Sequence, residues 1–251
     1  MGAPKSLSRL GLLPLAVAAA VQLGACAAVP TDPMQRALYD DANDPLEPMN
    51  RAFFAFNLKV DEIVLEPAAR GYRDAVPRGG RDAIQRFLHN LKSPVIFAND
   101  LLQAHFEDAY QTLGSFLVNS TIGILGFFNP AQADLREEDF GQTLAVWGAH
   151  AGPYLVLPLF GPSSLRDATS YLVDPFFDPL QFAIDDPERT GIAIGRAATG
   201  AVDDRSRTLE AFADLKKNSF DFYTTARSLY RQSRGNDIRN GAPEPVDYPT
   251  N

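Results

Sequence analysis

A stretch of 25 residues without a formal charge, residues 141–165, restricts the fold of this chain more than any other feature. About 20 apolar residues suffice for a helix that crosses a bilayer, so the length alone would fit a membrane span. However, three internal glycines and three prolines would interrupt a straight helix here. The stretch is therefore compatible either with broken, apolar structure at membrane depth or with an apolar loop on a protein core.

A second uncharged stretch covers residues 109–133 and includes the sequence SFLVNSTIGILGFFNPA. Its glycines and Asn119 argue against a simple spanning helix, and a buried core helix is an equally good interpretation of either stretch alone. Irregular backbone at membrane depth needs protein or a water-filled cavity to cover its polar groups. Helices that lie within one leaflet around such a cavity would accommodate both stretches.

The N-terminus has the organisation of a bacterial lipoprotein signal. Two basic residues precede an uncharged run of about 16 residues, too short to span a bilayer, and the run ends in Leu23-Gly24-Ala25-Cys26. We predict that residues 1–25 are a signal peptide and that Cys26, the only cysteine, carries the lipid attachment. An ordinary signal with a chance cysteine is the alternative. Residue 27 is Ala, whereas an Asp at this position usually retains a lipoprotein in the inner membrane. The sequence therefore predicts attachment to the outer membrane.

Removal of the signal leaves 21 basic against 31 acidic residues, a net charge of about −10. Such a chain is a poor partner for nucleic acid and gains nothing from an anionic lipid surface. Membrane attachment must then come from acyl chains and apolar surface. We divide the mature chain into a lipidated tether over 26–43, one domain over 44–232, and a tail over 233–251 that is too polar to order itself.

The apolar spacing predicts an all-α domain, because no alternating strand pattern persists. Met49, Phe53, Phe56, Val60 and Ile63 fall on one face of a helix that would end before Pro67. The further predicted helices are Pro77–Asn90, Ser93–Gln103, Phe106–Ser120, Asp139–Trp147, Ser163–Val173 and a long one from about Asp185 to about Tyr230.

The common catalytic and cofactor motifs are missing from the sequence. It has no glycine-rich phosphate loop, no dinucleotide fingerprint, no Gly-x-Ser-x-Gly elbow and no histidine pair spaced for zinc. We therefore predict no catalytic residue, no cofactor and no metal. His150 could act as a base, but packing is the commoner role, and LREEDF (Leu135 to Phe140) is expected to be a solvated approach to a helix. Trp147 and Tyr154 could either anchor at a lipid–water boundary or pack inside.

Four longer segments carry a family resemblance: NDPLEPMNRAFFAFN (43–57), EPAARGYRDAVP (66–77), NSTIGILGFFNPA (119–131) and DFGQTLAVWGAHAGPYLVLPLFGPSSLRD (139–167). With them the chain resembles the MlaA (VacJ) family of outer-membrane lipoproteins over about residues 43–180. Ser115 and Asn129 depart from the Arg and Asp expected in many members, which leaves the charge lining near this segment open.

The resemblance implies a ring of amphipathic helices in the periplasmic leaflet of the outer membrane, around a central amphipathic channel. It further implies that misplaced phospholipids leave the outer leaflet through this channel and pass to a periplasmic carrier of the same pathway, so that lipid asymmetry is maintained. Association with a trimeric outer-membrane porin is also implied. No nucleotide-hydrolysing motif is present, so we expect a passive conduit.

Under this interpretation nine residues are candidates for the lipid path: Asn57, Leu58, Leu117, Asn119, Ile122, Ile124, Phe127, Tyr154 and Leu157. Each could equally pack in the core. Two other functions stay open, a structural lipoprotein that accompanies a porin and a phospholipase. Normal lipid asymmetry in a null mutant would indicate the first, and release of fatty acid by the purified protein would indicate the second.

Overall fold

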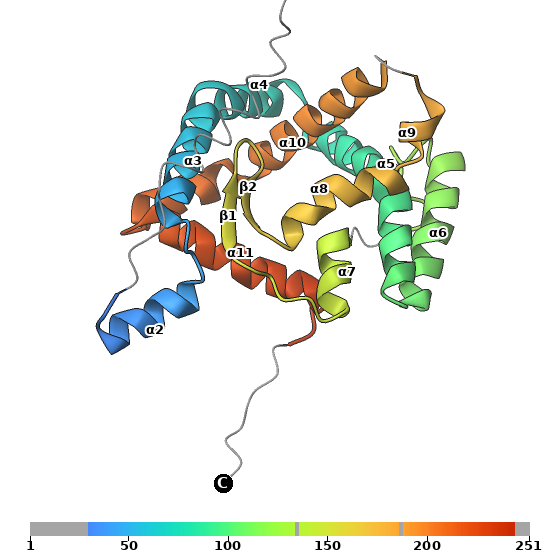
Figure 1. Ribbon diagram of the computed structural model, residues 1–251. Coiled ribbons are helices and arrows are strands. Elements are labelled where there is room, and N and C mark those ends of the chain that lie inside the picture. Colours follow the sequence, from blue (N-terminus) through green and yellow to red (C-terminus); the bar gives the residue numbers. More distant parts are fainter. Residues whose placement is uncertain (1–29, 134–135, 186–187, 244–251) are drawn as a thin grey trace, which may run out of the picture.

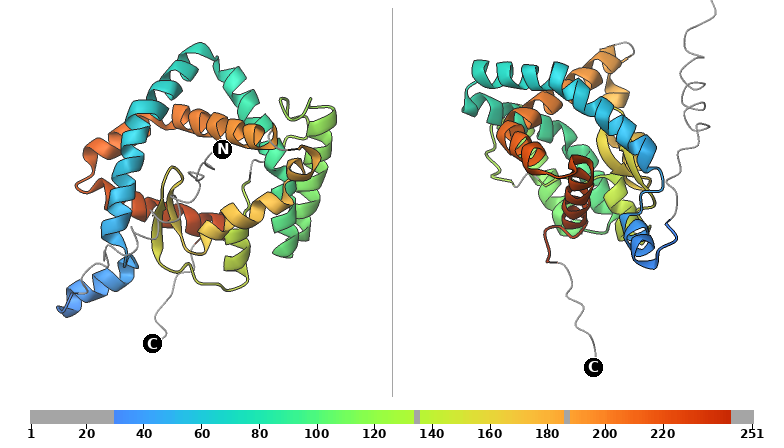
Figure 2. Two further views of the ribbon diagram at one scale, coloured as in Figure 1. Left: turned by 45° about the horizontal axis from the view of Figure 1, so that its top comes forward. Right: turned by 90° about the vertical axis from the view of Figure 1, so that its left-hand side faces the viewer.

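The computed structural model describes residues 30–133, 136–185 and 188–243, and nearly all regular structure within these ranges is helical (Figure 1). The long helices follow one another around the outline of a ring instead of lying side by side as a parallel bundle (Figure 2). The predicted ring-like, mainly α-helical architecture is thus confirmed. No helix in the described part of the chain is both long and apolar enough to cross a membrane.

One side of the ring is a continuous bent rod made of three segments. Helix α3 spans Glu47–Val60, the π-helical turn η2 spans Asp61–Leu65, and α4 spans Glu66–Ala75. The prediction that Pro67 lies beyond the helix end is wrong, because Pro67 occupies the first turn of α4. Proline cannot donate a helical hydrogen bond, and the π-helical turn directly before it, in which the N–H of Glu66 donates to the carbonyl of Asp61 five residues back, changes the hydrogen-bond register at this point of the rod.

The next two helices form a close pair at the far side of the ring. Helix α5 spans Arg78–Leu102 without a break at Pro94, so the two predicted helices 77–90 and 93–103 are one. Proline removes one helical hydrogen bond, but Ser93, Val95 and Ile96 around it are buried, and this packing keeps the helix continuous. Helix α6 spans Phe106–Thr121, as predicted.

The uncharged stretch over residues 141–165 contains a short helix and a β-hairpin. Helix α7 spans Phe140–Val146, close to the prediction, and strands β1 (Tyr154–Leu157) and β2 (Gly161–Ser164) pair in an antiparallel manner. The expectation of no strand is therefore wrong for this segment, and so is a helix beginning at Ser163. Short turns follow, namely η3 (Asp167–Thr169), α8 (Ser170–Val173), η4 (Asp174–Phe177) and α9 (Leu180–Ala183).

The C-terminal part consists of two helices where one was predicted. Helix α10 spans Glu188–Asn218 and packs on α4 and α5, and α11 spans Phe222–Ile238. The break is set by Asp221, whose carboxylate caps α11 by accepting hydrogen bonds from the backbone N–H groups of Tyr223 and Thr224. Helix α11 thus runs past the predicted domain end at residue 232, and helix α2 (Pro33–Ala42) lies within the range predicted as a tether.

The apolar core is small and lies between α3, the hairpin and α11. Tyr154, Val156 and Tyr223 are buried together, with Phe53 and Phe54 packed against them. Most other buried side chains are polar or charged. Because buried polar groups need hydrogen-bond partners, specific contacts hold much of this ring together.

Candidate functional site

A cavity of about 450 Å³, the central cavity, lies where α5, α7, β2 and the segments from η3 to α11 converge. Most of the residues that line it are of polar types, and seven of them are charged, Lys92, Asp139, Asp167, Asp174, Asp178, Arg196 and Arg234. Tyr171 and Tyr230 add two aromatic rings, and Val95, Pro162 and Pro175 add apolar surface. The cavity is thus polar and charged inside a protein whose outer surface carries many apolar side chains.

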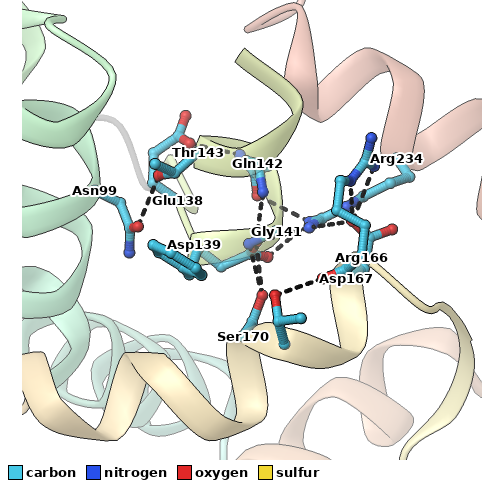
Figure 3. A network of polar contacts seen from close by, with 12 residues as sticks. Asn99, Glu138, Asp139, Gly141, Gln142, Thr143, Arg166, Asp167, Ser170 and Arg234 are labelled. Atoms are coloured by element: carbon cyan, nitrogen blue, oxygen red, sulfur yellow. Dashed lines mark hydrogen bonds and ion pairs between the residues drawn. The ribbon is translucent and has the colours of Figure 1, made fainter. Parts of the chain in front are cut away.

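Arg234 of α11 holds three elements together at one wall of the cavity (Figure 3). Its guanidinium donates to both carboxylate oxygens of Asp139 at 2.7 Å and to Oδ1 of Asp167 at 3.0 Å. Burial raises the pKa of Asp139, but the hydrogen bonds and positive charge of Arg234, together with hydrogen bonds from Gln142 and Ser170, outweigh burial and hold that pKa below its usual value, and the pKa of Asp167 is lowered as well. Both carboxylates are therefore ionised at neutral pH.

Gly141 leaves the space that this cluster needs. A Cβ atom at this position would lie 2.6 Å from the Arg234 guanidinium and 2.8 Å from the Cα atom of Asp167. The backbone N–H of Gly141 donates to the hydroxyl of Ser170, which in turn donates to Asp139 (Figure 3). The Asp-Phe-Gly sequence at the start of α7 is thus explained by packing against α11 and η3.

A buried chain of polar side chains leads away from the cavity between α5 and α7. Asn99 donates to Asp174 and accepts from Thr143, and Gln103 donates to both Thr143 and Glu138. Only 1% of the Glu138 surface is exposed, and its Oε1 has no partner in the described part of the chain. Burial raises the pKa of Glu138 to about 7 and that of Asp174 to about 6. The expectation that the acids of LREEDF are solvated is therefore wrong for Glu138.

Replacement of Glu138 by Gln should stabilise the protein at pH 8. The folded-state pKa of about 7 lies above the ordinary value of 4.5, so the folded chain binds more protons between these values, and stability falls as pH rises. A glutamine side chain cannot ionise, so the variant should gain up to about 3 kcal/mol at pH 8 and almost nothing near pH 4.5. Thermal unfolding in detergent at both pH values measures this. Glu188→Gln, which changes an exposed glutamate in the first turn of α10, is the control, and equal behaviour of both variants would contradict the prediction.

Two asparagines of α3 hold the hairpin against the helix. Asn50 is fully buried, and its amide donates to the carbonyl of Tyr154 while its oxygen accepts from the N–H of Val156. Asn57, two turns later, donates to the carbonyl of Leu157 and accepts from the N–H of Leu159. The side chains thus take the place of a neighbouring strand along β1.

A second cavity of about 530 Å³, the outer cavity, lies between α5, α6 and the loop that follows α6. Ser115 and Asn129, the two departures from the family pattern, both line it together with Arg86 and Asn119. Asn119 donates to Asn129, and Arg86 donates to the carbonyl of Phe127. Ser115 and Asn129 are uncharged, so the formal charges of the outer cavity come from Arg86, Asp100, Asp108 and Arg136.

Helix α6 and the turn after it present an apolar surface. Phe106, Tyr110, Leu113 and Leu117 recur every three to four residues on the exposed face of α6. The turn continues this surface with Ile122, Ile124, Leu125 and Phe128. Ile124 and Leu125 adopt positive φ angles of 51° and 58°, a strained conformation that is unusual for such side chains. Both residues with strained backbone thus lie on the exposed apolar surface.

The nine predicted lipid-path residues lie in three different places, and none of them lines the central cavity. Leu117, Ile122 and Ile124 belong to the apolar surface, with exposed fractions of 54%, 73% and 60%. Phe127 stacks on Phe87, and Asn119 lines the outer cavity. Asn57 and Leu157 form the contact between α3 and the hairpin, and Leu58 is half-buried on α3.

Tyr154 packs inside the protein, which decides between the two interpretations of this residue. Only 2% of its surface is exposed, and its ring contacts those of Tyr223 and Tyr230. Trp147 is more than half exposed, and its indole N–H donates to the carbonyl of Leu102. Trp147 is thus the one of the pair that could lie at a lipid–water boundary.

The charged residues of the central cavity were not predicted from the sequence. Asp139, Gly141 and Asp167 occur in a segment quoted for the family resemblance, but nothing in that segment indicated Arg234 as their partner. His150, considered as a base, is exposed in the loop after α7. No group of three potential metal ligands occurs within the described residues.

Comparison with known proteins gives consistent similarities. The family model described as MlaA lipoprotein matches residues 42–237. The intermembrane phospholipid transport system lipoprotein MlaA of Escherichia coli K12 is 30% identical over 96% of this chain and 94% of its own length. The protein of the same name from Haemophilus influenzae is 33% identical over 80% of this chain and 81% of its own.

A solved structure shows the same similarity in three dimensions. It was described as the structural basis for maintenance of bacterial outer membrane lipid asymmetry, and it superposes with a TM-score of 0.68 at 30% sequence identity. The match covers 78% of this chain and 98% of that one. An uncharacterised protein of Rickettsia felis is 33% identical over 76% of both chains.

Proposed function

Because the chain belongs to the MlaA lipoprotein family, we propose that it removes misplaced phospholipids from the outer leaflet of the outer membrane and thereby maintains lipid asymmetry. The lipid enters the ring from the membrane and leaves towards the periplasm. The observation that carries this proposal is the family match over residues 42–237, together with a charged cavity between the converging helices and many exposed apolar side chains.

The arrangement suits the chemistry of a phospholipid. Two acyl chains hold roughly 30 methylenes, and exposing all of them to water would cost on the order of 25 kcal/mol. A polar headgroup has the opposite problem in hydrocarbon. The charged lining of the central cavity can receive the headgroup, while Leu117, Ile122 and Ile124 contact lipid chains at the membrane-facing surface. In this proposal the path differs from the one predicted from sequence, because Tyr154 is buried in the core.

The protein lies in the periplasmic leaflet in this proposal, held by its apolar surface and by acylated Cys26. Cys26 lies outside the described residues. A single acyl chain binds a membrane only marginally, so several chains on one cysteine and apolar protein surface together give durable attachment. The partners are a trimeric porin, which places the ring beside the outer leaflet, and a periplasmic carrier that accepts the lipid. No energy source is part of this chain, so the direction of flow comes from the carrier side.

Deletion of the gene should raise the amount of phospholipid in the outer leaflet, and the full-length chain should restore the wild-type amount. Cys26→Ala should fail to restore it and should not incorporate radioactive palmitate, because the anchor is lost. Surface phospholipid is measured by the action of an added phospholipase on intact cells. Equal palmitate labelling of both forms would contradict the anchor. Normal surface phospholipid in the deletion strain would contradict the proposed function itself and favour a structural role.

A further inference from the structure

The charged groups around the central cavity do not balance. Four cations belong to its wall or contact it, namely Lys92, Arg166, Arg196 and Arg234. Five carboxylates face them, namely Glu137, Asp139, Asp167, Asp174 and Asp178. The wall thus carries one more negative than positive charge.

Each cation is already engaged by a carboxylate. Arg196 donates to Asp178 at 2.6 Å, and Lys92 forms an ion pair with Glu137. Arg234 is shared between Asp139 and Asp167, and Arg166 donates to Asp167 at 2.9 Å. A negatively charged group that enters the cavity therefore competes with a carboxylate for each of these cations.

Asp174 is the one of the five carboxylates that forms no ion pair with these four cations. Its Oδ1 accepts hydrogen bonds from two neutral groups, the Asn99 amide at 3.2 Å and the backbone N–H of Phe140 at 3.0 Å. Among the described residues no cation lies within ion-pair distance of it, and its Oδ2 accepts no hydrogen bond. Lys92 attracts it only from a greater distance and is also shared with Glu137 and Asp139. Tyr171, three residues earlier in the chain, lines the same cavity.

We infer that the central cavity favours phospholipids whose headgroup ends in an ammonium over those with a net negative headgroup, and that Asp174 binds the ammonium. This inference rests on the proposed function, since it names the class of lipid that enters the same cavity. Both lipid classes carry the phosphate, so the phosphate does not separate them. The ammonium does, because it forms an ion pair with Asp174 without disturbing another pair.

The test uses the full-length protein in vesicles of equal amounts of phosphatidylethanolamine and phosphatidylglycerol. Gln181, which lines the cavity and whose side chain bonds to no described residue, is replaced by the photo-crosslinking residue benzoylphenylalanine. After irradiation, the headgroups of the crosslinked lipids are counted by mass spectrometry. We expect phosphatidylethanolamine to exceed phosphatidylglycerol by about threefold, as a partly exposed ion pair of moderate strength would give.

Three further variants are made in the same crosslinking protein. Asp174→Asn keeps the acceptor for Asn99 and Phe140 but removes the charge, so the ratio should fall towards one. Asp178→Asn leaves Arg196 without its carboxylate, so the ratio should fall to one or below. Asp214→Asn removes the same charge from an exposed position on α10 outside the cavity and should leave the ratio unchanged.

The outcomes separate the inference from the function on which it rests. A wild-type ratio near one, or the same ratio in wild type and Asp174→Asn, would overturn the selectivity while lipid in the cavity still supports transport. Absence of any crosslinked lipid at position 181 would instead overturn the passage of lipid through this cavity, and the inference with it.

Discussion

Replacement of Arg234 by Ala should lower the stability of the protein by about 3–5 kcal/mol, because it leaves the partly buried carboxylate of Asp139 without a cation and the buried carboxylate of Asp167 with Arg166 alone. The Arg234 side chain is 13% exposed and joins α11 to α7 and η3 through Asp139 and Asp167. For a domain of this size each kcal/mol shifts the melting temperature by about 2–4 °C, so the variant should melt about 10 °C lower. Thermal unfolding in detergent and the amount of protein in the membrane measure the effect.

The pH dependence of this loss identifies its cause. In the wild type the depressed pKa of Asp139 contributes stability above the ordinary value of 3.8, and this contribution disappears as pH falls. Without Arg234, burial raises the pKa of Asp139 instead. Protonation of Asp139 then removes its unpaired charge and makes the variant more stable as pH falls from 7 towards 4. The difference between wild type and Arg234→Ala should therefore shrink in acid.

Two controls accompany the Arg234 variant. Arg234→Lys restores the charge but not the paired hydrogen bonds to Asp139, so it should recover only part of the loss. Arg239→Ala, just after the end of the same helix, removes a side chain whose hydrogen bond within the described residues is to the carbonyl of Ala242, and it should change stability by less than about 0.5 kcal/mol. A melting temperature for Arg234→Ala within 2 °C of the wild type would show that the cluster contributes little.

Local sequence patterns predicted those helices whose boundaries are set within the segment itself. Helix α6 has an unbroken run of helix-compatible residues from Phe106 to Thr121, and α7 has Asp139 as an N-cap. Helix α5 was predicted in two pieces because Pro94 normally ends a helix, yet burial around it keeps the turn intact. The break between α10 and α11 could have been found from Asp221, an N-cap residue before a helical pattern.

The hairpin could not be predicted from local sequence, because β1 forms hydrogen bonds with side chains of α3 as well as with β2. Each strand has only four residues, and β1 is completed by the side chains of Asn50 and Asn57, about 100 residues earlier. The central cavity was missed for a similar reason, since Lys92, Asp139 and Arg234 are far apart in the sequence. A local pattern indicates which face of an element is apolar, but not which distant arginine will neutralise a given carboxylate. The family resemblance marked Asp139 and Asp167 without revealing that pairing.

Replacement of Asn50 by Leu should destabilise the protein by about 3–5 kcal/mol, although leucine has the same number of side-chain heavy atoms and the same branching. The buried amide of Asn50 bonds to the carbonyl of Tyr154 at 2.9 Å, to the N–H of Val156 at 2.9 Å and to Asp44 at 2.7 Å. Leucine would leave the two backbone groups without partners, and each unsatisfied buried group costs about 1–3 kcal/mol. The hairpin should detach from α3, which thermal unfolding and proteolysis of the loop after Leu157 would detect.

Asn57→Leu is the matched control, since it makes the same substitution on the same helix against the same strand. Asn57 also forms two hydrogen bonds to the hairpin, but it is only partly buried and Leu159 is exposed, so water can replace the lost contacts. Its cost should stay near 1 kcal/mol. Equal losses in the two variants would mean that burial does not determine how firmly the hairpin is held. A small loss in both would mean that the aromatic contacts of Tyr154 with Tyr223 and Tyr230 suffice without the asparagines.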